Sequence, residues 1–320
     1  MLVKSLYFLP SSKCGGTRMG IFRNLLTTAV VFSASVNLAN ATAICDDVAT
    51  TQVIASDCEV LVDLANSTNV NGWTKTTNWF SEKPVGQWYG VTVANNRIVG
   101  LQLNQNNLTG TLPVSIGNIN AVTNFDLSDN KIESTIPNSI GNLVNVVDFS
   151  LAINKFTGSI PSTIVNFTKI KNFQVSLNEL SGSIIPIIGL TNAELISIHS
   201  NKFTGPIPSI IGFLTKAKFL WLDQNQLTGP IPNTIGQMAN LLSFTASYNK
   251  LSGIIPTNIG FATKLREIIL SSNLLEGPIP TQMGNLTDMQ VLLLNDNRLS
   301  GTIPSSLGNM TQLYQLFLSY

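Results

Sequence analysis

An asparagine recurs along most of this chain at a nearly constant interval. Successive asparagines are 24 residues apart, except for one interval of 23 residues between Asn178 and Asn201. Leucine-like residues stand eight, five and three positions before each asparagine and two positions after it, and a glycine and an Ile-Pro pair follow in most units. Such a period predicts that each unit is one supersecondary element and that stacked units share one continuous core. The recurring asparagines are Asn106, Asn130, Asn154, Asn178, Asn201, Asn225, Asn249, Asn273 and Asn297.

Each column of the repeat has a residue type that suits one structural role. Apolar residues at alternating positions, such as Ile268 and Leu270, predict a short strand with one buried face. The asparagine side chain carries both a donor and an acceptor, so we expect it to turn inward and satisfy backbone groups where the chain leaves the strand. The glycine permits a backbone conformation that is closed to other residues, and the proline fixes φ on the return path.

The consensus of these units, LxxLxLxxNxLxGxIPxxIGxLxx, resembles the plant-type leucine-rich repeat of receptor-like proteins, receptor kinase ectodomains and polygalacturonase-inhibitor-like proteins. The resemblance covers residues 98–320 as nine repeats plus a partial tenth. It implies a β-rich α/β repeat solenoid, a right-handed superhelix with a parallel sheet on its concave side. It implies little about the ligand, because one scaffold hosts many functions.

The first 43 residues have the pattern of a secretory signal peptide. Arg23 is followed by an apolar run from Leu25 through Val36 and then by small residues around Ala41. About 12 apolar residues are too few to span a bilayer, which argues against a membrane anchor. Residues 1–18 are interpreted as a long leading region or as sequence upstream of a true start at Met19. We therefore expect entry into the secretory pathway and an extracellular or cell-surface location.

Removal of that segment leaves two cysteines, Cys45 and Cys58, while Cys14 lies upstream of the cut. A pair of cysteines in a secreted chain favours a disulfide, and a loop this short would stabilise the fold by roughly 3 kcal/mol. The alternative is two free thiols. A metal site is not expected, because two cysteines and the distant His199 do not form a ligand set.

Residues 44–97 resemble the N-terminal cap that precedes plant-type repeats. Residues 57–65 have helical spacing, and Trp73, Trp79 and Trp88 follow in a W…NW…W-GV pattern. Large aromatic residues can cover the open apolar end of the first repeat, whereas the alternative is an aromatic binding site. The cap of the family usually has a second cysteine pair, which is missing here.

Two units and the end of the chain depart from the pattern. Ser134 replaces the glycine of its unit, and Pro186 falls one place late in the unit that is one residue shorter. We expect a local kink or changed curvature there. The chain stops at Tyr320, one residue before the next expected asparagine, so we expect a truncated sequence whose missing part could hold a membrane span, a kinase or a C-terminal cap.

Composition and motifs argue against several functions. Only 11% of the residues are charged and no Lys/Arg-rich run exists, so nucleic-acid binding is not expected. No catalytic or cofactor-binding fingerprint occurs, and we expect no cofactor. His199, Asp223, Ser176 and Ser247 could be assembled into a triad on paper. A flat ladder of strands about 5 Å apart offers them no oxyanion pocket, so we expect a protein that is not an enzyme.

Binding is better supported by the residues that alternate with the core. Residues two, four and six places before each asparagine should point outward from the sheet. The column four places before is polar at first and largely apolar from Trp221 onward. Exposed aromatic clusters of this kind mark interaction sites, unless twist and the irregular unit bury them. The predicted ligand-binding residues are His199, Phe219, Trp221, Asp223, Tyr248, Ile269 and Leu293.

Sequons for N-glycosylation occur at several places in the predicted mature chain. Three of them share one phase of the repeat and should lie on the convex return, which would leave the concave face free. The alternative is chance occurrence in an asparagine-rich chain. The candidate acceptors are Asn66, Asn107, Asn166, Asn285 and Asn309.

We therefore expect a non-enzymatic extracellular recognition module that binds a protein, peptide or glycan on its concave and lateral faces. One alternative is the ectodomain of a receptor-like kinase, which would contact a membrane only through a missing C-terminal segment. Another is an inhibitor of a secreted wall-degrading hydrolase. A third is a structural adhesion or ice-binding surface on an interrupted serine column, which comprises Ser128, Ser176, Ser247, Ser271 and Ser319.

Overall fold

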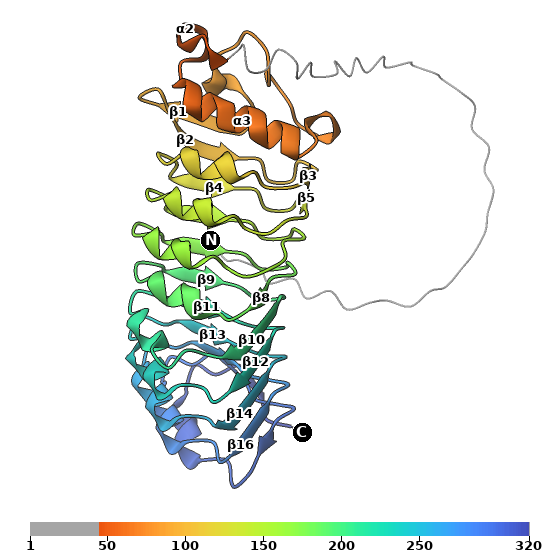
Figure 1. The fold of residues 1–320 in the computed structure, drawn as a ribbon. Helices are drawn as coiled ribbons and strands as arrows, with labels where there is room; N and C mark the ends of the chain where they lie inside the picture. Colours follow the sequence, from red (N-terminus) through yellow and green to blue (C-terminus); the bar gives the residue numbers. More distant parts are fainter. Residues whose placement is uncertain (1–44, 320) are drawn as a thin grey trace, which may run out of the picture. The chain divides into compact units, whose positions relative to one another are not determined.

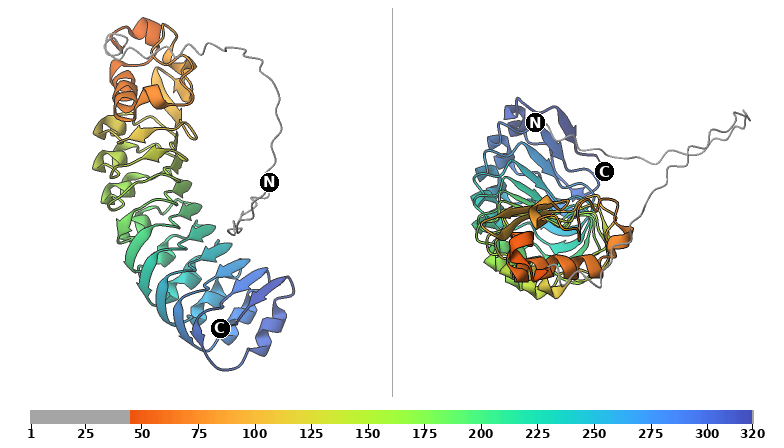
Figure 2. Two further views of the ribbon diagram at one scale, coloured as in Figure 1. Left: turned by 90° about the vertical axis from the view of Figure 1, so that its right-hand side faces the viewer. Right: turned by 90° about the horizontal axis from the view of Figure 1, so that it is seen from above.

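The computed structural model describes residues 45–319, so the predicted signal peptide and Cys14 lie outside the described residues. From residue 98 onward the chain folds into coils that stack in sequence order (Figure 1). Each coil holds one strand of a long parallel sheet and one 3-10 helix on its return path. Figure 2 shows the same succession of coils from two further sides. The predicted leucine-rich-repeat solenoid is confirmed.

The long sheet contains the strand that the apolar alternation predicted in each coil. It has eleven strands, of which β1 is antiparallel to β2 and every later neighbouring pair is parallel. The strands are β1 (Val91–Ala94), β2 (Arg97–Gln102), β4 (Asn124–Asp126), β6 (Asp148–Ser150), β7 (Asn172–Gln174), β9 (Leu195–Ser197), β11 (Phe219–Trp221), β13 (Ser243–Thr245), β15 (Glu267–Ile269), β17 (Val291–Leu293) and β19 (Gln315–Phe317).

A second set of strands follows the ladder asparagines and was not predicted from the sequence. It forms a six-stranded sheet in the order β18-β16-β14-β12-β10-β8 and a separate pair, β3-β5. The repeat glycine ends or bends these strands with a positive φ, as at Gly229 (φ 73°), and Ser134 lacks that conformation. The strands are β3 (Thr109–Gly110), β5 (Lys131–Ile132), β8 (Ser181–Gly182), β10 (Lys202–Pro206), β12 (Gln226–Gly229), β14 (Lys250–Ile254), β16 (Leu274–Gly277) and β18 (Arg298–Leu299).

The Ile-Gly part of each repeat forms a 3-10 helix, and the repeat proline precedes that helix in most coils, as Pro232 precedes η9. The apolar residue of the helix is buried, as Ile235 is. The helices are η4 (Val114–Asn118), η5 (Asn138–Asn142), η6 (Ser162–Asn166), η7 (Ile185–Gly189), η8 (Ile211–Phe213), η9 (Asn233–Gln237), η10 (Thr257–Phe261), η11 (Thr281–Asn285) and η12 (Ser305–Asn309).

The shorter unit absorbs its missing residue between β8 and η7. In that coil η7 begins at Ile185 with Pro186 inside its first turn, whereas the proline of the regular coils stands just before the helix. The strands on either side stay in register, with Phe173 of β7 opposite Ile196 of β9. The deletion therefore changes the return path and leaves the long sheet continuous.

The interior is one continuous apolar core that runs through all the coils. Leucine and isoleucine columns are fully buried, and in the first coils phenylalanines replace them. The rings of Phe125 and Phe149 stack with centroids 5.4 Å apart, and those of Phe149 and Phe173 are 5.6 Å apart. Each coil thus covers the apolar face of the one before it, as a stack of units that cannot fold alone requires.

The ladder asparagines lie at the edge of this core. The Asn249 Nδ2 donates to the carbonyl oxygens of Leu222, Ala246 and Ser247 at 3.0, 3.2 and 3.1 Å, and its Oδ1 accepts from the backbone N–H of Leu227 at 2.9 Å. The same pattern recurs at Asn225 and Asn273. One side chain therefore joins the backbone of two successive coils.

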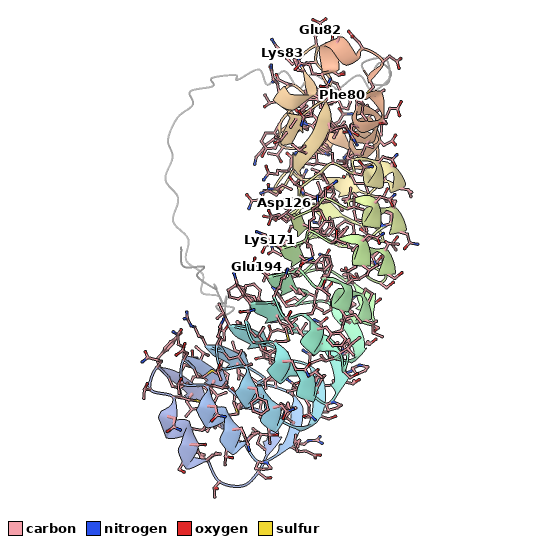
Figure 3. All side chains as sticks on the ribbon, turned by 90° about the vertical axis from the view of Figure 1, so that its left-hand side faces the viewer. Phe80, Glu82, Lys83, Asp126, Lys171 and Glu194 are labelled. Carbon is pink, nitrogen blue, oxygen red and sulfur yellow. A yellow bond between two sulfur atoms is a disulfide. The ribbon has the colours of Figure 1, made fainter. Side chains whose placement is uncertain are left out.

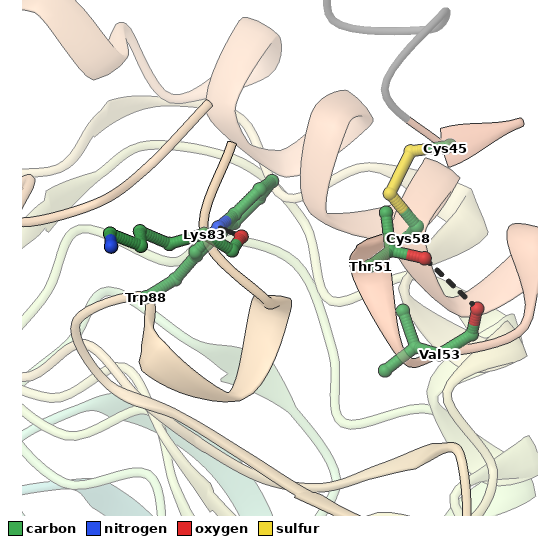
Figure 4. The surroundings of a disulfide bond; sticks show 6 residues. All are labelled: Cys45, Thr51, Val53, Cys58, Lys83 and Trp88. Atoms are coloured by element: carbon green, nitrogen blue, oxygen red, sulfur yellow. Dashed lines mark hydrogen bonds between the residues drawn. A yellow bond between two sulfur atoms is a disulfide. The ribbon is translucent and has the colours of Figure 1, made fainter. Parts of the chain in front are cut away.

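Residues 45–97 pack on the first coil. Their helices are α2 (Val48–Thr51), α3 (Ala55–Ser67), η2 (Val70–Gly72) and η3 (Val85–Gln87). Trp73, Trp79 and Trp88 are buried, and each indole N–H donates to a backbone carbonyl, as Trp88 does to Lys83 at 3.1 Å. Cys45 and Cys58 form the predicted disulfide, which ties the start of the described chain to α3 (Figure 4). No helix within residues 45–319 is both long and apolar enough to cross a membrane.

Candidate ligand-binding face

The alternation of each strand separates core residues from a row of outward side chains. Leu220 and Leu222 are fully buried, while Trp221 between them is half-buried and faces away from the core. We call the surface formed by the residues six, four and two places before each ladder asparagine the sheet face. Its first coils carry polar groups such as Asp126, whereas Lys171 and Glu194, labelled near it in Figure 3, stand one place outside these columns.

The sheet face becomes aromatic and apolar from β11 onward. Phe219 and Trp221 of β11 are half-buried, and their ring centroids are 5.8 Å apart. Ile269 of β15 and Leu293 of β17 are also half-buried, and Phe317 of β19 is 53% exposed. The predicted apolar stretch therefore lies on the sheet face, partly shielded by its own neighbours.

The outward side chains of β13 are small and lie buried beneath those neighbours. Ser243 is 4% exposed and Thr245 is 5% exposed, although both point away from the core. The Trp221 Nε1 donates to the Ser243 hydroxyl at 3.1 Å, so the indole of one coil lies against the strand of the next. Small residues on one strand thus let larger residues from both neighbouring coils converge on it.

Two carboxylates also converge on β13, one from each side. Asp223 accepts hydrogen bonds from the Ser247 N–H at 2.8 Å, from the Ser247 hydroxyl at 2.7 Å and from the Thr245 hydroxyl. Glu267 accepts from the Ser243 hydroxyl at 2.5 Å. Together these side chains form what we call the β13 cluster, which comprises Trp221, Asp223, Ser243, Thr245, Ser247 and Glu267.

His199 lies beside this cluster but does not form a catalytic triad with it. Its Nδ1 lies 3.0 Å from the Ser200 hydroxyl, and the Asp223 oxygens are bonded to Ser247 and Thr245. Burial lowers the pKa of His199 below its ordinary value of 6.5, and the nearby Asp223 carboxylate opposes that shift. Within residues 45–319, no group of three His, Cys, Asp or Glu side chains is placed to hold a metal ion.

His199 is the single histidine in the sequence, so its titration can be followed by NMR without assignment ambiguity. We expect a pKa below 6.5 in the folded protein, because burial disfavours the charged ring. The unfolded chain then binds the proton more tightly, so the free energy of unfolding should fall as pH drops through about 6.5 and below. This dependence should be lost in His199→Gln. A folded-state pKa above 6.5 would contradict the burial of the ring.

The remaining predicted ligand-binding residues lie in the β13 cluster, beside it on the sheet face, or off that face. Trp221 and Asp223 belong to it, Phe219 packs on Trp221, and Ile269 and Leu293 continue the sheet face over the next two coils. Tyr248 is 60% exposed and has a left-handed φ of 52°, one place before its ladder asparagine and off the sheet face. Ser243, Ser247, Thr245 and Glu267 were not predicted as site residues, although small residues facing an acidic neighbour could have indicated them.

The serine column proposed for adhesion or ice binding does not form an exposed row. Ser176, Ser247 and Ser271 are 5%, 7% and 7% exposed. Ser247 donates to Asp223, and Ser271 donates to the Asn295 Oδ1 at 2.7 Å. The hydroxyls of Ser247 and Ser271 are thus engaged within the protein, and only Ser319 at the end of the column is exposed.

The sequons lie in two environments. Asn166, Asn285 and Asn309 are the last residues of η6, η11 and η12 and are exposed, and Asn66 is exposed on α3. By contrast, the Asn107 Nδ2 donates to the Gly72 carbonyl at 2.7 Å and helps to join the first coil to η2. The Asn107 amide nitrogen, which a glycan would occupy, is therefore part of the fold.

Comparison with known proteins agrees with this architecture. The Leucine Rich Repeat family model matches residues 121–143, 216–238, 264–286 and 288–310. No curated protein matches the chain. A plant peptide hormone receptor, RGFR1, solved in complex with RGF2, is 36% identical over 67% of this chain and 34% of that chain, with a TM-score of 0.64. This chain therefore spans about a third of the receptor chain that it matches.

Two further solved structures share the fold over most of this chain. The ectodomain of the Arabidopsis receptor kinase HAESA, in complex with an extended IDA peptide hormone, is 25% identical over 85% of this chain and 50% of that chain, with a TM-score of 0.66. A plant ice-binding protein is 24% identical over 79% of this chain and 90% of that chain, with a TM-score of 0.65, and shows a likeness of fold alone. The chain is thus a leucine-rich repeat protein of the plant type, and it resembles the ectodomains of plant receptor kinases and a plant ice-binding protein.

Proposed function

We propose that this chain is a non-enzymatic extracellular recognition module that binds a peptide segment along its sheet face. The observation that carries the proposal is the β13 cluster with the aromatic and apolar side chains beside it. Half-buried Phe219, Trp221, Ile269 and Leu293 offer apolar area that a ligand can cover, and the Asp223 and Glu267 carboxylates of the β13 cluster can orient the ligand. Interfaces typically combine such aromatic anchors with a small number of fixed polar groups.

The relatives support a peptide over the other ligand classes. The RGFR1 structure is described as a plant peptide hormone receptor in complex with RGF2, and the HAESA structure as a complex with a peptide hormone. An extended peptide also matches the geometry of this face, because parallel strands about 4.8 Å apart repeat similar outward positions along the stack. Binding is expected to be non-covalent. The receptor-kinase and hydrolase-inhibitor readings remain alternatives for the protein in which such a module acts.

The full chain, immobilised after secretion, should enrich specific sequences from a random peptide-display library. Trp221→Ala should then weaken binding of an enriched peptide by about 2 kcal/mol, or roughly thirtyfold in Kd, because a central aromatic anchor is lost. Fluorescence anisotropy with the labelled peptide measures this change. The melting temperature should change little, since Trp221 lies outside the core.

Phe261→Ala is the matched control for the loss of an aromatic side chain. Phe261 is 65% exposed at the end of η10, away from the sheet face, so its removal should leave the affinity unchanged. If no peptide is enriched, or if the Phe261 variant loses binding as strongly as the Trp221 variant, the proposed peptide site on the sheet face is wrong.

A further inference from the structure

The charge of the sheet face has one sign. The three columns that define this face hold four carboxylates, those of Asp126, Asp148, Asp223 and Glu267, and contain no Lys or Arg. The basic residues nearest in sequence, such as Lys218 and Arg266, stand one place outside these columns. A surface built this way attracts cationic groups and repels anionic ones.

None of these four carboxylates is neutralised by an ion pair within the described part of the chain. The salt bridges there join Asp57, Glu133, Glu179 and Glu194 to basic partners, all off the sheet face. Lys218 in particular is paired with Glu194 at 2.6 Å, and it forms no salt bridge with Asp223 or Glu267. The negative charge of the sheet face is therefore left for a ligand to meet.

Asp223 and Glu267 are also held in position before any ligand arrives. Both accept hydrogen bonds from hydroxyls of β13 or of Ser247, which follows it, and both carboxylates keep acceptor capacity beyond those bonds. Side chains that are already fixed lose little conformational entropy on binding, so less of their attraction for a cation is offset by that entropy cost.

The indole of Trp221 adds a second feature that suits a cation. Its Nε1 donates to the Ser243 hydroxyl, which in turn donates to Glu267, and Phe219 packs beside the indole ring. An ammonium or guanidinium group is attracted to an aromatic face, and a guanidinium group can stack on it while pairing with a carboxylate. An acidic peptide would find neither interaction.

We infer that the peptide recognised by the sheet face is basic, with a Lys or Arg next to an apolar side chain. The cationic group pairs with Asp223 or Glu267, and the apolar side chain packs on Phe219 and Trp221. This inference rests on the proposed peptide-binding function and adds the chemical class of the ligand. The carboxylates of Asp126 and Asp148 extend the same preference toward the N-terminal coils.

The test is the composition of the peptides that the full chain selects from an unbiased display library. Lys and Arg should be enriched beside apolar residues, and Asp and Glu should be depleted. Binding of an enriched peptide should weaken as ionic strength rises, because exposed charge pairs are screened by salt. Asp223→Asn and Glu267→Gln should each weaken that peptide's binding about tenfold.

Glu276→Gln is the matched control, since it removes the same charge from an exposed position on β16 and should leave the affinity unchanged. Peptides enriched without any excess of Lys or Arg would overturn the inference while leaving the proposed function in place. Equal binding by wild type, Asp223→Asn and Glu267→Gln would do the same, because the inference assigns the cationic group of the peptide to these two carboxylates. If no peptide is selected at all, both the inference and the proposed function are wrong.

Discussion

Replacing Asp57 with alanine should lower the free energy of unfolding by about 3–5 kcal/mol, the range typical of breaking a buried ion pair. The Asp57 side chain is fully buried on α3 and accepts from the Arg97 Nε at 3.0 Å, from the Arg97 Nη2 at 3.1 Å and from the Ile98 N–H at 2.8 Å. Arg97 and Ile98 open β2, so this carboxylate joins the N-terminal helix to the first parallel strand of the solenoid.

The expected loss of stability is large because the hydrogen-bond partners of Asp57 remain in place without their acceptor. Without the carboxylate, the Ile98 N–H is buried with no acceptor, and Arg97 keeps only its bond from Nη2 to the Asn120 Oδ1 at 2.8 Å. The same contact now raises the pKa of Arg97, chiefly through the hydrogen bond to Asp57. Orphaned buried groups cost about 1–3 kcal/mol each, and more when they are charged.

Chemical denaturation followed by tryptophan fluorescence measures this effect well, since three of the four tryptophans, Trp73, Trp79 and Trp88, lie in the N-terminal region. Asp63→Ala is the matched control, because Asp63 is exposed on the same helix. It should change the free energy of unfolding by less than about 0.5 kcal/mol. A loss below about 1 kcal/mol for Asp57→Ala would mean that the ion pair does not hold the N-terminal region to the repeats.

The phase of the strands could be predicted from the sequence because a strict period carries the same information nine times. Leu220 and Leu222 are fully buried and Trp221 faces outward, in the order that the alternation of apolar residues indicated. A single unit would not have sufficed, since apolar residues also occur on the sheet face at Ile269 and Leu293. The repetition separates the column that is always apolar from the column that is sometimes apolar.

The β13 cluster could not be predicted in full because it depends on side-chain size in neighbouring coils. Ser243 and Thr245 point outward, yet they are buried. Trp221 and Asp223 from the preceding coil and Glu267 from the following coil contact their hydroxyls and cover them. Alternation tells which way a side chain points, but not what covers it. The contact between Asp57 and Arg97 was invisible for a related reason, because no periodic pattern links two residues that are 40 positions apart.

The second sheet was not predicted because its residues include glycine and proline, which usually end strands. Glycine and proline are both depleted in strands, yet Gly205 and Pro206 lie within β10 and pair with residues of β12. Pairing is tolerated because these strands are short, and stacking already places consecutive backbones side by side. Local propensity is thus overridden by the long sheet and the shared core.

Asn249→Ala should lower the free energy of unfolding by about 3–4 kcal/mol, although the change removes no apolar contact area of note. Asn249 is 8% exposed, and its side chain makes four hydrogen bonds to the backbone. Two of them reach the preceding coil, to the Leu222 carbonyl and from the Leu227 N–H. In the variant the Leu227 N–H loses its side-chain acceptor, and three backbone carbonyl oxygens beside the core lose a donor.

The result of that substitution also tests how strongly the coils are coupled. In a solenoid the stability is a sum of unit and interface contributions, so weakening one interface in the middle of the array can separate it into two parts that unfold independently. Urea denaturation of Asn249→Ala should therefore show a lower midpoint and a smaller m-value than the wild type, since less surface is exposed in each step.

Asn233→Ala is the matched control, because Asn233 is exposed at the start of η9, and it should leave both quantities unchanged. If Asn249→Ala lowers the midpoint while the m-value stays constant, the array unfolds as one cooperative body and the apolar core alone couples its coils. If neither quantity changes, water replaces the amide and the ladder does not stabilise the stack.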